Sequence, residues 1–231
     1  MTLFSSLSSF CLKGPFLGPS DGSEIKKCVI LLHGWGANGA NLIELGKAWG
    51  PLLPGTLFFA PNAPTSLSHD GISATDSYQW FPFDPNDLSS LSLNIRNALP
   101  ILRSLIQEIQ KAFSLKISDI ALVGFSQGAV LALDLALNDG LPLAGIVGYS
   151  GGIFGTFSAP FSSPPLCLIH GDQDFVIPPE ALQKAVQFLT HNTISHEAHL
   201  LKGLEHTISH DGIEIGGKFL KTCLYGDTRQ T

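Results

Sequence analysis

A five-residue turn at residues 124–128, Gly-Phe-Ser-Gln-Gly, constrains the fold more than any other part of the chain. The apolar run before it, residues 120–123, is typical of a buried strand, and the run after it, residues 129–133, favours a helix. So short a turn forces strained dihedral angles on its central residue, and the flanking glycines relieve the crowding. The turn therefore lifts the hydroxyl of Ser126 clear of a sheet and directs the N–H of Gln127 into the same space. A bystander serine in a glycine-rich turn is the alternative for these five residues alone, and the strand before and helix after favour the nucleophile.

Strand-like and helix-like segments alternate on both sides of this turn. We expect strands at residues 28–33, 56–60, 120–123, 143–149, 166–170 and 195–201, and helices at residues 41–49, 88–113, 129–140, 178–189 and 207–224. The strand segments are continuously apolar, which predicts a mostly parallel sheet covered by helices on both faces, an α/β fold. Pro100 is expected to kink the longest helix or split it in two. The sequence of residues 61–87 predicts a long irregular excursion of the chain. We expect this excursion to close over a functional site.

Composition predicts one domain and argues against several classes of function. The 231 residues, 44% apolar and 14% charged, predict a single α/β domain over residues 1–231, with frayed ends at residues 1–12 and 226–231. A net charge of −6, with 13 Lys and Arg spread thinly, argues against nucleic-acid binding. The chain has no apolar run long enough for a transmembrane helix, and its N-terminus lacks the basic start and cleavage site of a signal peptide. We expect a cytoplasmic protein with four reduced cysteines, whose state as a monomer or homodimer the sequence leaves open.

A serine hydroxyl is a weak nucleophile near neutral pH, so Ser126 needs a base, and the base needs an orienting carboxylate. In hydrolases built on this turn the partners follow in the order serine, acid, histidine, beyond the carboxyl ends of the strands. Of the five histidines that follow Asp174, only His206 lies in a loop between the last strand and the last helix. We therefore predict His206 as the base and Asp174 as the acid, while Asp172 braces its turn through backbone N–H groups. An aspartate alone at such a place more often caps a turn or helix, but the three residues in this order favour catalysis.

Two backbone N–H groups are needed to stabilise an oxyanion on the substrate. One is predicted from Gln127 and the other from Trp35, in the glycine-rich turn at residues 33–39. Glycines let this backbone approach a substrate closely. His33 lies in the same turn and is expected to hydrogen-bond within the loop.

The adjacent aromatic residues Trp80 and Phe81 close the excursion. Either they pack in the core and pin the loop, or they line an acyl-chain pocket as a substrate-binding wall. No metal site is predicted, because His33 and His170 have no third ligand and the cysteines lack metal-binding spacing.

Four sequence blocks resemble the phospholipase/carboxylesterase family, which includes acyl-protein thioesterases and small bacterial carboxylesterases. They are residues 32–36, 124–128, 170–178 and 203–209, in family order within a match over about residues 13–224. The resemblance implies an α/β-hydrolase fold without a large lid domain. It also implies site residues, namely the triad Ser126, Asp174 and His206, the oxyanion donors Trp35 and Gln127, and the acyl-groove pair Trp80 and Phe81. Trp35, Ala129 and residues 66–77 differ from the thioesterase members, so the bacterial carboxylesterases are the more similar branch.

These observations predict a serine hydrolase that needs no cofactor or metal. It would cleave carboxylic esters or thioesters of short-to-medium acyl chains through an acyl-serine intermediate. Two alternatives stay open, a lysophospholipase or acyl-protein thioesterase acting on long chains, and a non-catalytic ligand-binding relative. An interaction module that only keeps the fold would have no reactive serine.

Overall fold

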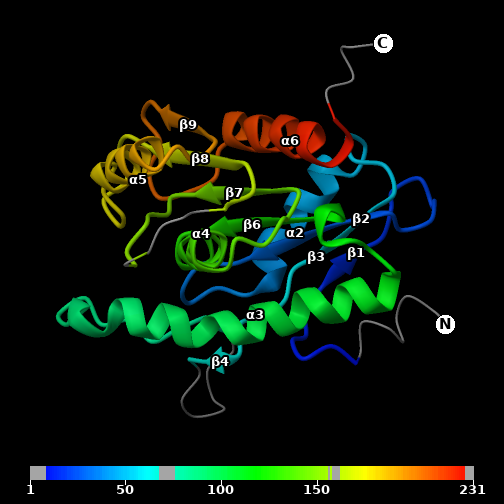
Figure 1. The fold of residues 1–231 in the computed structure, drawn as a ribbon, viewed down its shortest axis with the longest axis horizontal. Helices are drawn as coiled ribbons and strands as arrows, with labels where there is room; N and C mark the ends of the chain where they lie inside the picture. The colour runs from blue at the N-terminus through cyan, green and yellow to red at the C-terminus, as the bar shows by residue number, and fades with distance from the viewer. Residues whose placement is uncertain (1–8, 68–75, 156, 158–161, 227–231) are drawn as a thin grey trace.

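The structure is a computed structural model that describes residues 9–67, 76–155, 157 and 162–226. These residues form a seven-stranded sheet in the order β1-β3-β2-β6-β7-β8-β9 (Figure 1). Its strands are β1 (Phe16–Leu17), β2 (Lys27–Leu32), β3 (Thr56–Phe59), β6 (Ile120–Phe125), β7 (Gly145–Tyr149), β8 (Leu166–Gly171) and β9 (His196–Leu201). All neighbouring pairs are parallel except β1 with β3, which confirms the predicted mostly parallel sheet.

Helices cover both faces of the sheet (Figure 1). On one face lie α3 (Leu91–Phe113), α4 (Gln127–Asp139) and α5 (Glu180–His191), and on the other lie α2 (Gly39–Trp49) and α6 (His210–Tyr225). Alternate residues of one strand enter different cores: Ile30 of β2 packs on the α3 face, and Val29 and Leu31 pack on the α2 face. Because both faces are buried, the central strands are mostly apolar, whereas the edge strand β9 has the sequence His-Glu-Ala-His-Leu-Leu and is partly exposed, so the expectation of continuous apolar strands is wrong for β9. The α/β architecture predicted from the sequence is confirmed.

Pro100 is expected from the sequence to kink the longest helix or to split it. Helix α3 runs without interruption from Leu91 to Phe113 with Pro100 inside it, so the second alternative, the split, is wrong. A proline in a helix interior removes a hydrogen bond and costs about 3 kcal/mol. Each fully buried aliphatic side chain contributes about 1.5–3 kcal/mol, so the packed face of α3 outweighs one proline. The buried residues of that face are Ile95, Ala98, Leu99, Leu102, Leu105, Ile106 and Ile109.

The first described residues are packed rather than frayed. Phe10 is 3% exposed, and its ring makes edge-to-face contacts with the rings of Phe59 and Phe113. Leu12 is also buried. The expectation of a frayed start is therefore wrong for residues 10–12, because aromatic packing anchors them to β3 and α3. Residues 1–8 and 227–231 lie outside the described residues.

The excursion at residues 61–87 contains two short strands, β4 (Thr65–Ser66) and β5 (Tyr78–Gln79), which pair antiparallel. Tyr78 is hydrogen-bonded to the turn after β2, because its N–H donates to the Ala37 carbonyl and its carbonyl accepts from the Gly36 N–H. Residues 68–75 lie outside the described part, and the prediction that the excursion closes over the site depends partly on them. A 3₁₀ turn, η1 (Leu88–Ser90), then leads into α3, and a second one, η2 (Ile117–Asp119), leads into β6.

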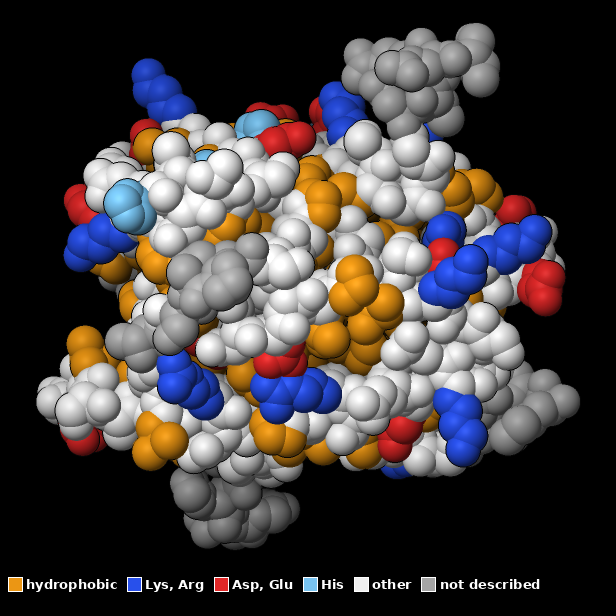
Figure 2. Space-filling model, viewed as in Figure 1, with side chains coloured by type: hydrophobic (Ala, Val, Ile, Leu, Met, Phe, Trp, Pro, Cys, Tyr) orange, Lys and Arg blue, Asp and Glu red, His pale blue; other side chains and the backbone are white. Residues whose placement is uncertain are grey.

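Charged side chains are scattered over the face shown in Figure 2, where Lys and Arg lie among acidic groups rather than in one basic area. Two examples are the ion pairs Arg103–Asp139 and Lys218–Glu214. The face in view therefore has no single area of concentrated positive charge among its described residues. Within the described ranges, no helix is both long enough and apolar enough to cross a bilayer.

Candidate active site

Ser126 occupies a strained turn between β6 and α4. Its backbone angles, φ 54° and ψ −117°, lie in a region that residues other than glycine rarely adopt. The flanking glycines are required by close backbone contacts. A Cβ on Gly128 would lie 2.1 Å from the Leu32 carbonyl oxygen, and one on Gly124 would lie 2.4 Å from the Ala129 nitrogen. The sequence pattern therefore produces the predicted sharp turn, with the serine at its apex.

The structure brings Ser126, His206 and Asp174 into one hydrogen-bonded chain. The Nε2 atom of His206 lies 3.0 Å from the Ser126 Oγ, and its Nδ1 atom lies 2.7 Å from Asp174 Oδ2. The three residues come from the loops after β6, β9 and β8, all at the carboxyl edge of the sheet. Asp174 is 2% exposed, whereas the His206 side chain is 18% exposed. The acid is therefore shielded from water and the histidine faces accessible space.

Several donors hold the Asp174 carboxylate in its ionised form. Its Oδ1 atom accepts from the backbone N–H groups of Val176, at 3.0 Å, and Ile177, at 2.9 Å. Burial acts to raise the pKa of Asp174, but hydrogen bonds from His206, the Ile177 N–H and the Ser150 hydroxyl outweigh it and hold that pKa below its usual range. The sequence analysis did not find Ser150. It directly follows β7, and its positive φ of 47° is not visible in the residue pattern.

Asp172 connects two of the loops that form the site. Its Oδ1 atom accepts a 2.6 Å hydrogen bond from the N–H of Gly203, in the loop that carries His206. The sequence predicts that Asp172 braces its own turn through backbone N–H groups; its partner is a backbone N–H, but one that belongs to the neighbouring loop. Asp172 therefore couples the loop after β8, which carries Asp174, to the loop after β9.

The predicted oxyanion donors lie on the two turns that meet at Ser126. Gln127 directly follows the serine and begins α4. The turn of Trp35 approaches from β2, since a Cβ on Gly34 would lie 3.3 Å from the Ser126 Cβ. Among the described residues, no hydrogen bond occupies the backbone N–H of Trp35 or Gln127, so both are available to a ligand.

Trp80 and Phe81 are buried, at 2% and 3% exposure, and pack in the core on the α3 face. The Gln127 side chain bonds to both, since its Oε1 accepts from the Trp80 N–H and its Nε2 donates to the Phe81 carbonyl, each at 2.8 Å. The Trp80 indole N–H also donates to the His33 carbonyl at 2.8 Å. These contacts favour the first alternative, in which the pair pins the excursion to the site. The acyl-pocket role stays a prediction.

His33 is a neutral buried histidine. Its Nε2 accepts the N–H of Ala63 at 3.0 Å, so the proton lies on Nδ1, which donates to the Gly34 carbonyl at 2.7 Å. Burial lowers the pKa of His33, in agreement with this neutral form. The expected bond within the loop is confirmed. His170 makes a separate bond, from Nε2 to the Ile177 carbonyl at 2.8 Å.

A cavity of about 480 Å³ opens beside His206, between α2, the end of β6 and the start of α6. Its volume lies within the range of small-molecule sites. The lining is mostly apolar and includes Leu42, Leu45, Phe125, Ile208 and Ile213. The Phe125 ring also packs on the His206 imidazole, with the ring centroids 4.8 Å apart. Neither Trp80 nor Phe81 lines this cavity.

A serine at a strained strand-to-helix turn, with a histidine and an aspartate at further strand ends of a mostly parallel sheet, defines the class of α/β-hydrolases. The described residues show no separate lid domain, as predicted. The model of the phospholipase/carboxylesterase family matches residues 19–224, and the chain belongs to that family. The resemblance inferred from the four sequence blocks is confirmed.

Individual relatives agree with this assignment. The chain is 29% identical over 221 residues to acyl-protein thioesterase 1 of Saccharomyces cerevisiae, covering 86% of this chain and 93% of that protein. The crystal structure of esterase PE8 superimposes with a TM-score of 0.81 at 36% identity, covering 92% of this chain and 99% of that one. A carboxylesterase from Mesorhizobium loti shares the fold, with a TM-score of 0.73 at 19% identity over 93% and 96% of the two chains. The family is thus one of ester and thioester hydrolases.

Proposed function

We propose that this protein hydrolyses carboxylic esters or thioesters through an acyl-serine formed on Ser126. The observation that carries the proposal is the hydrogen-bonded chain from Asp174 through His206 to Ser126 at the strained turn. The family membership and the similarity to an acyl-protein thioesterase and to an esterase support the same chemistry. A non-catalytic relative would not need this arrangement.

In the proposed mechanism, His206 Nε2 takes the proton of Ser126 as the Oγ attacks the acyl carbonyl carbon. The N–H groups of Trp35 and Gln127 stabilise the negative oxygen of the tetrahedral intermediate. Asp174 stays ionised, as its lowered pKa requires, and stabilises the imidazolium. The intermediate collapses, the proton on His206 passes to the departing alcohol or thiol, and the acyl group stays on Ser126.

A water molecule completes the cycle. His206 removes a proton from this water as it attacks the acyl-serine, and a second tetrahedral intermediate forms at the same oxyanion site. Collapse of that intermediate returns the proton to the Ser126 Oγ and releases the carboxylic acid. The protein's own groups supply every proton transfer, so no cofactor enters the proposal.

For the acyl chain we propose a short-to-medium length, since the cavity beside His206 has a moderate volume of about 480 Å³. A second candidate is a long-chain substrate. Exposed apolar side chains next to the site favour it, because Trp35, Phe175 and Val176 are 57%, 83% and 67% exposed. Each additional buried methylene contributes about 0.8 kcal/mol, or roughly fourfold in kcat/KM. A series of p-nitrophenyl esters distinguishes the two, by a kcat/KM that stops rising at medium length or continues to rise.

The first experiment combines an activity assay with active-site labelling. A fluorophosphonate should label Ser126, and peptide mass spectrometry should locate the adduct there. Ser126→Ala should abolish labelling and reduce kcat by about five to six orders of magnitude. His206→Ala should also prevent labelling, because the serine loses its base.

Ser195→Ala is the matched control for this experiment. Ser195 is exposed and directly precedes β9, at the opposite edge of the sheet from the site. This variant should be labelled and active like the unmodified protein. Folded protein that never labels, or that labels at another residue, would contradict the proposed function.

A further inference from the structure

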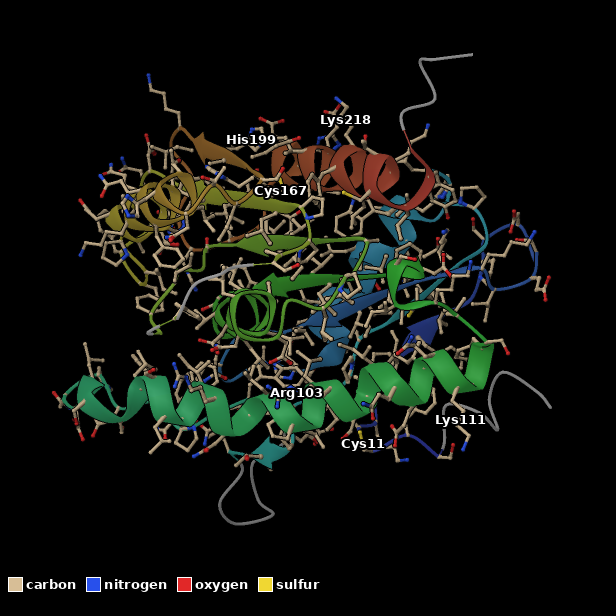
Figure 3. All side chains as sticks on the ribbon, viewed as in Figure 1. Cys11, Arg103, Lys111, Cys167, His199 and Lys218 are labelled. Carbon is tan, nitrogen blue, oxygen red and sulfur yellow. The ribbon has the colours of Figure 1, made fainter. Side chains whose placement is uncertain are left out.

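A second group of reactive side chains lies on β8 and β9, near the part of the sheet that α6 covers, where Figure 3 labels Cys167 and His199. It contains Cys167 of β8 with Glu197 and His199 of β9, whose sulfur, oxygen and nitrogen ligand atoms all lie within 4.8 Å of one another. The strand register explains this proximity. Cys167 is paired with Glu197, and His199 is two residues further along β9, so its side chain projects from the same face.

One buried nitrogen of this group lacks a hydrogen-bond partner. His199 Nε2 is buried and has no hydrogen-bond partner among the described residues. It faces the Glu197 Oε2 at 3.5 Å. A buried nitrogen without a partner is unfavourable, and either a proton shared with Glu197 or a bound cation would satisfy it. The neighbouring thiol of Cys167 makes a cation the better match.

A second thiol lies close to this group. Burial and the charge of Glu197 raise the pKa of Cys167 to about 12 and that of Cys223, on α6, to about 11. The same carboxylate therefore acts on both thiols. Both are protonated near neutral pH, so a metal ion that binds a thiolate here must displace a proton.

We propose that Cys167, Glu197 and His199 form a binding site for a zinc ion, with the fourth coordination position left to water. Thiolate, imidazole and carboxylate are the three side-chain ligands of zinc, which binds them in a tetrahedron at about 2.0–2.3 Å. In such a tetrahedron the ligand atoms are about 3.5 Å apart, which is the separation of His199 Nε2 and Glu197 Oε2, and all three ligand atoms lie within 4.8 Å of one another. Magnesium and calcium prefer all-oxygen sites and are poor matches for a thiol.

The proposed ion supports the fold and takes no part in ester cleavage. It joins the edge strand β9 to β8, and these two strands lead into the loops of His206 and Asp174. The residue pattern does not indicate this site, because its ligands come from two strands and have no motif spacing. Only the register of β8 against β9 brings them together.

The test uses the full chain after treatment with a chelator and dialysis. Calorimetric titration with Zn²⁺ should show one ion per chain, with release of about one proton because a thiol is deprotonated. Zn²⁺ should also raise the melting temperature, and Mg²⁺ should not. His199→Gln and Glu197→Gln should each weaken Zn²⁺ binding about 10-fold or more. Both side chains are partly or largely exposed, so the metal-free variants should fold and melt like the unmodified chain.

Three control variants separate this site from others. His191→Gln and Cys11→Ser remove an exposed histidine and an exposed thiol outside the group, and Zn²⁺ affinity should not change. His206→Ala removes the histidine beside Ser126 and should leave Zn²⁺ binding intact. Equal affinity in His199→Gln, or loss of binding in His206→Ala, would overturn the proposal.

Discussion

Two aspartate carboxylates are equally buried, but their pKa values are shifted in opposite directions. Asp174, at the proposed catalytic site, and Asp134, in α4, are each 2% exposed. The pKa of Asp174 lies below its usual range, whereas burial raises the pKa of Asp134 from 3.8 to about 6. Burial acts to raise both values, so a further factor decides the sign.

That factor is the number of hydrogen-bond donors. Both oxygens of Asp174 are bonded, to backbone N–H groups and to His206. Asp134 accepts a 2.7 Å bond from the Asn138 amide on Oδ1, and its Oδ2 atom has no partner among the described residues. The comparison shows that hydrogen-bond donors are concentrated around Asp174, the carboxylate of the proposed catalytic site, and are fewer around Asp134.

The two carboxylates also act on stability in opposite directions. The folded-state pKa of Asp174 is depressed, so its stabilising contribution is present above the ordinary pKa and is lost as the pH falls. The folded-state pKa of Asp134 is raised, so ionising it in the folded protein costs stability. That cost appears as the pH rises from about 4 to about 6.

The largest effect is predicted for the substitution that removes the negative charge of Asp174. Asp174→Asn should lower kcat by about four orders of magnitude, because a neutral amide favours the wrong histidine tautomer and does not stabilise the imidazolium. Ester hydrolysis followed from pH 5 to 9 measures the effect. A loss below tenfold in folded protein would show that the donors around Asp174 do not serve catalysis.

A smaller effect, a gain in stability rather than a loss of activity, is predicted for the removal of the second carboxylate, that of Asp134. Asp134→Asn should raise the free energy of unfolding at pH 7 by about 1–2 kcal/mol, because the neutral amide avoids the cost of a buried charge. This is less than the roughly 3 kcal/mol that the full pKa shift implies, because the buried amide brings N–H donors that need acceptors of their own. Urea unfolding at pH 4 and pH 7 provides the measurement.

The pH dependence of this second effect is specific. The gain from Asp134→Asn should be near zero at pH 4, where the unmodified carboxyl is protonated, and complete by pH 7. Asn138→Leu, which removes the donor to Asp134, is the control and should destabilise the protein most at pH 7. Equal gains from Asp134→Asn at both pH values would refute the raised pKa. Ester hydrolysis should be unchanged in this variant.

The comparison also shows which features the sequence could predict. Continuous apolar runs identified the strands, because parallel strands are buried on both faces. The glycines around Ser126 identified the turn, because their backbone contacts leave no room for a Cβ. The donors to Asp174 and the group around Cys167 depend on strand register and on a positive φ, which residue patterns do not encode. The persistence of α3 through Pro100 reflects tertiary packing in the same way.

The smallest predicted effect concerns one donor at the site. Ser150→Ala removes the hydroxyl that bonds to Asp174, and kcat/KM should fall about five- to tenfold, corresponding to about 1 kcal/mol for one hydrogen bond. Without this donor the pKa of Asp174 should rise toward its usual range, because one of the hydrogen bonds that hold the carboxylate in its ionised form is lost. Ester hydrolysis followed from pH 5 to 9 measures the loss.

Ser150→Gly separates the hydroxyl from the backbone strain at this position. Glycine also lacks the hydroxyl but adopts the φ of 47° without strain, so this variant should lose the same activity and retain more stability than Ser150→Ala. If both variants keep the original kcat/KM and pH profile, the carboxylate needs only its backbone donors and His206. The contrast with Asp134 would then rest on His206 and on the two backbone N–H groups, which the turn of residues 174–177 supplies whatever residue follows β7.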